Sequence, residues 1–306
     1  MSTLDSDSTS RGPFEGSVAA HEGAGRGGRV WERALREARL AIPLGFVVLV
    51  LVAAVFANRL APYNPVQQNI TARLQEPGSH HLLGTDQFGR DILSRLLVGA
   101  RATMEVAFAA TALACVTGTV LGMVGGYFAG IAELATVRLA DLILSFPPIV
   151  LAILIVTMVG PGVVTLIFVI AFLYIPTFTR VTNGQVMTVK RMSYVEASRA
   201  LGCGTLRIMA RTILPNVLSP IIVQFSLTVA GSILLESGLS FLGLGVVPPT
   251  PSWGLMIQEG RGYMSVSANG LIWPCLVIVV VILAVNSVGD ALRDRLDPRL
   301  RGSGGG

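Results

Sequence analysis

Residues 190–202 read KRMSYVEASRALG, a charged stretch that lies between two long apolar segments. Ser193 and Glu196 have the spacing of a capping box, in which each side chain satisfies a backbone N–H at the start of a helix. Gly202 can adopt the left-handed conformation that ends a helix, and Thr205 can cap a second one. The first helix would be about 13 Å long at about 1.5 Å per residue. It is too short to cross a membrane, so the sequence predicts a helix–turn–helix that lies at one membrane face.

The composition is that of an integral membrane protein. Of the 306 residues, 52% are hydrophobic and only 13% are charged, whereas soluble domains carry roughly 25% charged residues. The net charge of +5 is better explained by membrane orientation than by nucleic-acid binding. The sequence contains no G-x-x-x-x-G-K-[ST] phosphate-binding loop, and its three cysteines are scattered. We therefore expect no catalytic residues, no metal site and no cofactor bound by this chain.

Six apolar segments predict an all-α polytopic fold with six transmembrane helices, because a spanning helix needs about 20 apolar residues. Pro147 and Pro148 are expected to kink the third helix. Six spans place both termini on the same side, and the cytoplasmic side holds 17 of the 23 basic residues in that topology, as the positive-inside rule requires. The expected spans are residues 40–57, 103–127, 137–159, 163–179, 217–235 and 271–288.

The charged stretch resembles the EAA loop of permeases from binding-protein-dependent ABC importers. That motif has Glu-Ala-Ala, a Gly six residues after the Glu, and a later Leu-Pro; here Ser198 replaces the second Ala. The resemblance implies a coupling loop, residues 190–216, that sits in a groove of a cytoplasmic ATPase. The coupling residues that it implies are Ser193, Tyr194, Glu196, Ala197, Ser198, Gly202, Leu214 and Pro215.

Three further stretches extend the resemblance to the dipeptide/oligopeptide/nickel branch of these permeases, and to its second, C-type subunit. They are GTDQFGRD at residues 84–91, SFLGLG with PPTPSWG at residues 240–254, and GDALRDRLDPR at residues 289–299. The fold that this resemblance implies is that of type I (MetI-like) importer permeases. The implied transmembrane domain covers residues 101–291.

The remaining segments are assigned around that domain. Residues 1–39 are expected to be a basic, largely disordered cytoplasmic tail, with a short helix from Trp31 to Arg39 at the membrane surface. Residues 58–100 are expected to be extracytoplasmic and to contain an interfacial helix. Residues 292–306 form a charged cytoplasmic tail.

The resemblance also implies partners and a location. They are a B-type second permease, two ABC ATPase subunits or one fused ATPase, an extracytoplasmic substrate-binding protein and the lipid bilayer of the bacterial inner membrane. ATP and Mg would be bound by the ATPases. The cargo, whether dipeptide, oligopeptide, nickel chelate or another small nutrient, is left open.

A polar stripe in the fifth span is a candidate for the transport pathway, because polar residues within spans often face a pathway. The alternative is that the hydroxyls bond the preceding turn and the carboxylate reaches interfacial water. The stripe consists of Gln224, Thr228, Ser232 and Glu236.

Other interpretations remain open at this stage. His80 and His81 near Asp86 could suggest a metal, but two adjacent histidines without a third ligand are more typical of a solvated loop. The chain could also be a stand-alone secondary transporter or channel, or a membrane scaffold that transports nothing. A stand-alone transporter or channel does not explain a short docking helix between two spans, and the polar stripe in the fifth span argues against a scaffold.

Overall fold

The computed structural model describes residues 24–296, and the side chains of residues 40–296. Within that range the chain is built from helices and loops. The long helices are α1 (Ala24–Val55), α3 (Ile92–Phe128), α4 (Gly130–Leu144), α5 (Pro148–Val159), α6 (Val163–Val189), α9 (Leu214–Phe241) and α11 (Asn269–Leu296). The shorter ones are α2 (Ala57–Leu60), α7 (Ser193–Ala200), α8 (Thr205–Arg207), α10 (Trp253–Arg261), the 3₁₀ turn η1 (Ile70–Ala72) and the π-helical segment η2 (Ile208–Ile213).

The predicted all-α membrane fold is confirmed, and the count of six spans is approximate. In the described part of the chain, four helical segments are long and apolar enough to cross a membrane: α3, α6, α11 and the continuous stretch Thr205–Phe241 that ends in α9. The bent pair α4 and α5 makes a fifth span if it is counted as one. The apolar part of α1, Leu40–Val55, is shorter.

The third predicted span is broken rather than kinked. Helices α4 and α5 meet at an angle of 89°. Pro147 is extended, with ψ of 124°, because the following Pro148 clashes with a helical conformation of the residue before it. Pro148 then begins α5, where its missing N–H is harmless. Two consecutive prolines thus end one helix and start the next.

Two other boundaries differ from the predicted ones. Helix α1 already begins at Ala24, so residues 24–39 are helical where a largely disordered tail was predicted. Residues 32–39 consist entirely of Glu, Arg, Ala and Leu, which are strong helix formers, and they continue directly into the apolar span. The predicted interfacial helix is the first part of α3, a single helix that begins after the N-cap Asp91. Residues 1–23 and 297–306 of the predicted tails lie outside the described residues.

The centre of the molecule is the crossing of α3 and α6. A Cβ atom at Gly118 would lie 2.6 Å from Cβ of Phe178, and one at Gly122 would lie 2.6 Å from the backbone oxygen of Thr179. Glycine at these positions therefore lets the two helices approach closely, as small residues do in membrane proteins. The surrounding core contains the fully buried Val106 and Ile170.

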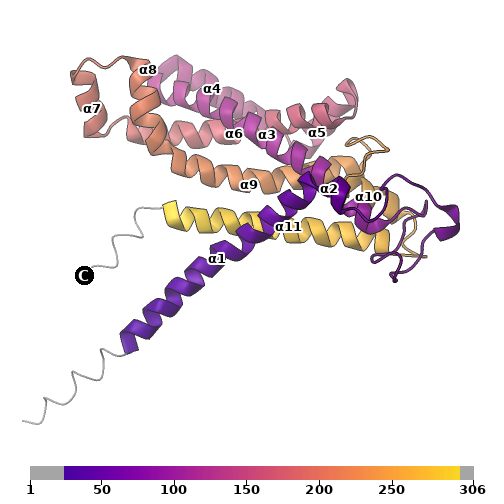
Figure 1. The fold of residues 1–306 in the computed structure, drawn as a ribbon. Helices are drawn as coiled ribbons and strands as arrows, with labels where there is room; N and C mark the ends of the chain where they lie inside the picture. Colours follow the sequence, from indigo (N-terminus) through magenta and orange to yellow (C-terminus); the bar gives the residue numbers. More distant parts are fainter. Residues whose placement is uncertain (1–23, 297–306) are drawn as a thin grey trace, which may run out of the picture.

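The elements divide between two ends of this helical body (Figure 1). Helices α7 and α8 lie at one end, together with the last turns of α11. Helices α2 and α10 lie at the other end, together with the long loop between α2 and α3. The two stretches that the sequence analysis singled out, residues 190–216 and 84–91, are therefore at opposite ends.

Candidate functional site

The predicted docking helix is α7, but its N-terminus differs from the prediction. Met192 is the N-cap residue, and no side chain makes a capping hydrogen bond. Ser193 is already the first helical residue, so the predicted capping box with Glu196 is wrong. Thr205 is likewise the first residue of α8, with Gly204 as its N-cap. In both cases the chain turns into the helix one residue earlier than the side-chain pattern suggested.

The C-terminus of α7 is as predicted. Gly202 is left-handed, with φ of +75°. Its N–H donates to the oxygen of Arg199 at 2.9 Å, and the N–H of Cys203 donates to the oxygen of Ser198 at 3.1 Å. These two bonds form a Schellman motif, which satisfies carbonyls that a helix end leaves unpaired. The chain therefore leaves α7 in a defined direction.

A small number of contacts hold α7 against the rest of the chain. Val195 is fully buried in the same apolar cluster as Val189 and Ile213. Nζ of Lys190 donates to the backbone oxygen of Gly126 at 2.6 Å, which ties the start of the loop to the last turn of α3. Val195 is the only buried residue of α7 itself, so α7 packs against the rest of the chain through a small part of its surface.

The other faces of α7 and its turn are exposed. Leu201 is 83% exposed, Leu206 80% and Tyr194 43%. Exposed large apolar side chains that gather in one patch are typical of interaction surfaces. Of the predicted coupling residues, Ser198 and Leu214 are partly buried, and the exposed ones are Ser193, Tyr194, Glu196, Ala197, Gly202 and Pro215.

The predicted coupling loop, residues 190–216, is called the docking loop below. It joins α9 through the π-helical segment η2. Ile208 and Ile213 on this segment are buried, so the wide turn is packed against the core. Nδ2 of Asn216 donates to the backbone oxygen of Thr212 at 2.6 Å, across the junction with α9. The loop is thus continuous with α9 at its C-terminal end, without an intervening coil.

Most of the polar stripe of α9 packs inside the chain. Nε2 of Gln224 donates to Oγ1 of Thr228 at 3.1 Å, and Oγ of Ser232 lies 3.1 Å from Oγ1 of Thr111 on α3. Glu236 is completely buried; Oγ of Ser240 donates to one of its carboxylate oxygens at 2.7 Å, and the hydroxyl of Ser237 lies 3.3 Å from the other.

Three of the four stripe residues, Thr228, Ser232 and Glu236, are therefore buried against neighbouring helices, while Gln224 is partly exposed. Pathway lining stays a prediction for the stripe. For the three buried residues it would require α9 to turn or to separate from α3.

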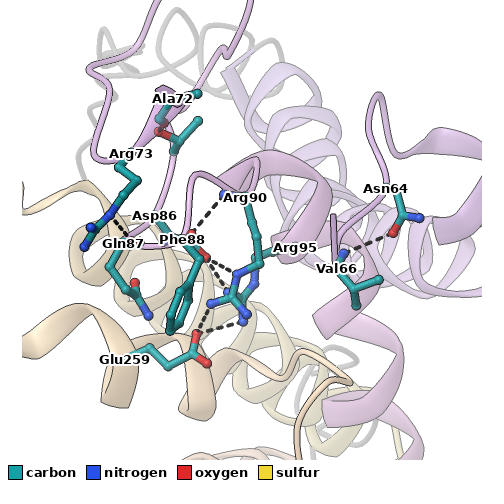
Figure 2. A network of polar contacts seen from close by, with 11 residues as sticks. Asn64, Val66, Ala72, Arg73, Asp86, Gln87, Phe88, Arg90, Arg95 and Glu259 are labelled. Carbon is teal, nitrogen blue, oxygen red and sulfur yellow. Dashed lines mark hydrogen bonds and ion pairs between the residues drawn. The ribbon is translucent and has the colours of Figure 1, made fainter. Parts of the chain in front are cut away.

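The opposite end of the molecule holds a cluster that the sequence analysis missed (Figure 2). Oδ2 of Asp86 accepts from Nε of Arg90 at 2.6 Å and also pairs with Nη1 of Arg95. Oε2 of Glu259, on α10, accepts from Nη2 of Arg90 at 2.7 Å and from Nη2 of Arg95 at 2.9 Å. All four side chains are buried or nearly so, and Arg95 is only 2% exposed. We call these four residues the charge cluster.

The charge cluster explains much of the GTDQFGRD motif. The other carboxylate oxygen of Asp86, Oδ1, accepts from the backbone N–H groups of Phe88 and Arg90, at 2.8 and 3.0 Å. These two bonds hold the turn at residues 86–90 closed. Asp91 caps α3 by accepting from the N–H of Ser94 at 2.8 Å, and it pairs with Nδ1 of His81 at 2.9 Å. Arg90 and Asp86 were visible as motif residues, but Glu259 is distant in sequence and nothing local points to it.

The same contacts bear on the metal interpretation. His81 is engaged by Asp91, and Asp86 by two arginines. Among the described residues, no group of three or more His, Cys, Asp and Glu side chains is arranged to hold a metal ion.

A family model described as "Binding-protein-dependent transport system inner membrane component" matches residues 118–302. Similar curated proteins cover most of the chain. The dipeptide transport system permease protein DppC of Haemophilus influenzae is 40% identical over 85% of this chain and 90% of its own length. The glutathione transport system permease protein GsiD of Pectobacterium atrosepticum is 39% identical over 89% of this chain and 90% of its own length. The di/tripeptide transport system permease protein DppC of Pseudomonas aeruginosa is 40% identical over 84% of this chain and 86% of its own length.

Among solved structures, an inward-facing conformation of the MetNI methionine ABC transporter contains a chain of similar fold. The match has a TM-score of 0.55 and 17% sequence identity, and it covers 67% of this chain and 98% of that chain. At this identity the likeness concerns the fold, and it agrees with the predicted type I permease architecture.

Proposed function

The chain belongs to the family of binding-protein-dependent transport system inner membrane components, and from this membership we propose that its cargo is a short peptide. It is a membrane-embedded, multi-pass permease subunit of an ABC importer, and it is not itself catalytic. The family favours this function over a stand-alone transporter or channel. Three similar permeases are named for dipeptides, di/tripeptides and glutathione, and all three names describe small peptides. That shared chemistry supports a peptide cargo.

The coupling between ATP hydrolysis and transport is proposed to act through the docking loop. The observation that carries this proposal is the combination of a buried Val195 with the exposed Tyr194, Glu196 and Leu201 around it. An ATPase surface would cover the apolar side chains, and Glu196 would meet polar groups of the groove. Because η2 joins the loop to α9 directly, movement of α7 would be transmitted to α9 as a rigid-body displacement.

The remaining assembly follows the family resemblance. We propose a second, B-type permease as the other half of the pathway and two ATPase subunits, separate or fused, that bind ATP and Mg. A substrate-binding protein would deliver cargo on the side of α10. The docking loop would face the cytoplasm, and both termini would lie on that side of the bacterial inner membrane.

The first test is a pull-down of the tagged chain, solubilised in mild detergent from its native membrane, with partners identified by mass spectrometry. We expect ATPases with phosphate-binding loops, a second permease and a binding protein. Recovery of the chain alone, under conditions in which a known importer stays assembled, would contradict the proposal. The binding protein recovered in this way can then be titrated with dipeptides, longer peptides and glutathione to identify the cargo.

The coupling test uses Glu196→Gln in the reconstituted importer. We expect peptide uptake per ATP hydrolysed to fall while membrane insertion is unchanged. The matched control is Glu76→Gln, which changes a carboxylate at the opposite end of the molecule, where its oxygen accepts from Nδ2 of Asn269 at 2.9 Å. If both variants matched the unmodified importer in peptide uptake and in ATPase activity, Glu196 would have no part in the coupling mechanism.

A further inference from the structure

A groove lies between the last turns of α1 and the first half of α3. Its volume is about 320 Å³, within the size range of ordinary ligand sites. Leu51 and Val55 line it from α1, and Met104 and Phe108 line it from α3. Val55 is 72% exposed, so the groove opens on the outside of the helical body rather than into its core. Its walls are mainly apolar.

The groove lies at the depth of a membrane interface. The apolar part of α1 is Leu40–Val55, and the chain becomes polar directly afterwards at Asn58 and Arg59. The groove residues of α1 are therefore in the last turns of its apolar stretch. This end of α1 is also the end where α2 and α10 lie (Figure 1).

Two charged residues of opposite sign, Arg101 and Glu105 of α3, also line the groove. Both are exposed, and neither has an ion pair or a side-chain hydrogen bond to another residue of the described part of the chain. They are four residues apart on one helix face, but with the cation nearer the N-terminus, which is the weaker order for such a pair. Both charges are thus free to bind a ligand that carries one charge of each sign.

We propose that this groove binds a zwitterionic phospholipid with an ethanolamine headgroup. An acyl chain lies against Leu51, Val55, Met104 and Phe108. The phosphate accepts hydrogen bonds from the guanidinium of Arg101, which can donate two at once. The ammonium group donates to the carboxylate of Glu105. An anionic phospholipid satisfies Arg101 equally well but leaves Glu105 without a cation, so the site prefers the zwitterion.

The test is lipid titration of the purified importer complex, after delipidation, by native mass spectrometry. Phosphatidylethanolamine and phosphatidylglycerol with identical acyl chains are compared. We expect Arg101→Gln to weaken both lipids about tenfold, since a hydrogen bond to a charged group contributes about 1.5 kcal/mol or more. Glu105→Gln should weaken phosphatidylethanolamine alone and so remove the preference. Arg261→Gln, an exposed arginine on α10 outside the groove, is the matched control and should change neither.

A second variant tests the groove itself. Val55→Trp fills it from an exposed position, so we expect loss of both lipids with normal insertion and an unchanged melting temperature. A photoreactive residue at position 55 should crosslink to lipid in the assembled complex. Equal affinity for the two lipids in the unmodified protein would overturn the proposal, as would crosslinking of position 55 to the second permease.

Discussion

The two ends of this molecule are held together in different ways. At one end, the charge cluster of Asp86, Arg90, Arg95 and Glu259 joins the loop before α3 and the first turn of α3 to α10. At the other end, α7 is anchored by the single buried Val195 and exposes most of its other side chains. The charges of the first end are paired within the chain, whereas the second end exposes apolar side chains, which we propose a partner covers. Substitutions should therefore affect stability at the first end and coupling at the second.

The largest effect on stability is expected from Arg95→Met. Arg95 is buried and pairs with both carboxylates of the charge cluster, so its removal leaves an excess of buried negative charge. Breaking a buried ion pair in this way costs about 3–5 kcal/mol. We expect a strongly lowered melting temperature in detergent. The control Arg261→Met removes an exposed cation that stacks on Phe241, 5.0 Å from the ring centroid, and should change the melting temperature much less. Similar shifts for both variants would show that the charge cluster contributes no more to stability than an exposed arginine at the same end.

A pair of glycine substitutions gives the next largest difference. A Cβ at Gly254 would lie 2.7 Å from Cα of Ser237 and 2.8 Å from Cβ of Ser240, so Gly254→Ala forces α10 away from α9. Such overpacking costs about 1–3 kcal/mol. A Cβ at Gly202 would meet no atom within 4 Å, and only its left-handed backbone opposes alanine, by about 1–2 kcal/mol.

Thermal melting and hydrogen exchange of the two glycine variants distinguish the two ends of the molecule. Gly254→Ala should lower the melting temperature of the whole chain. Gly202→Ala should instead increase hydrogen exchange in residues 193–204 with little global change. If Gly202→Ala were the more destabilising globally, the loop would be part of the cooperative core.

A smaller and local effect is expected from Val195→Ala. The substitution removes two methyl groups from a fully buried position, which costs about 1–2 kcal/mol of burial free energy. Because Val195 is the only buried residue of α7, we expect hydrogen exchange to accelerate in residues 190–213 and to stay unchanged in α10. Val116→Ala, at an exposed position of α3, is the matched control. Unchanged exchange in the loop would show that α7 is held by contacts other than its buried side chain.

The smallest effect on stability is expected from Tyr194→Ala. Tyr194 lies on the exposed face of α7, and surface substitutions usually change stability by less than about 0.5 kcal/mol. The isolated chain should melt at the same temperature as the unmodified protein. Copurification of the ATPases should nevertheless decrease, because apolar area leaves the docking surface. If the variant copurified as much ATPase as the unmodified chain, residues of the docking loop other than Tyr194 would make the contact.

Local signals allowed several features to be predicted from the sequence. Gly202 was recognised because a helix stop needs a residue that tolerates positive φ, and this depends only on neighbouring residues. The long apolar segments also predict spanning helices, so the helical membrane fold can be predicted from the sequence. Pro147 and Pro148 marked the correct place, although two prolines produced a break where a kink was expected.

Other features depend on contacts that no local pattern encodes. The charge cluster requires Arg90 and Arg95 to meet Glu259 on a helix more than half the chain away. The stripe on α9 was interpreted from its spacing alone, and spacing does not say which face meets α3. Ser193 failed as a cap because the chain enters α7 one residue earlier, and a capping pattern does not fix that backbone geometry.

The π-helical segment η2 has a consequence for how this region tolerates insertions and deletions. A π turn is an α-helical turn that has absorbed one extra residue. Deleting one residue from Ile208–Ile213 can therefore restore ordinary helical winding and leave the flanking helices in register. The same deletion in the middle of α9 would rotate everything beyond it by about 100°, and the hydroxyl of Ser232 would no longer face Thr111. Gains and losses of single residues between relatives should gather in η2, and chimeric loops are best joined there.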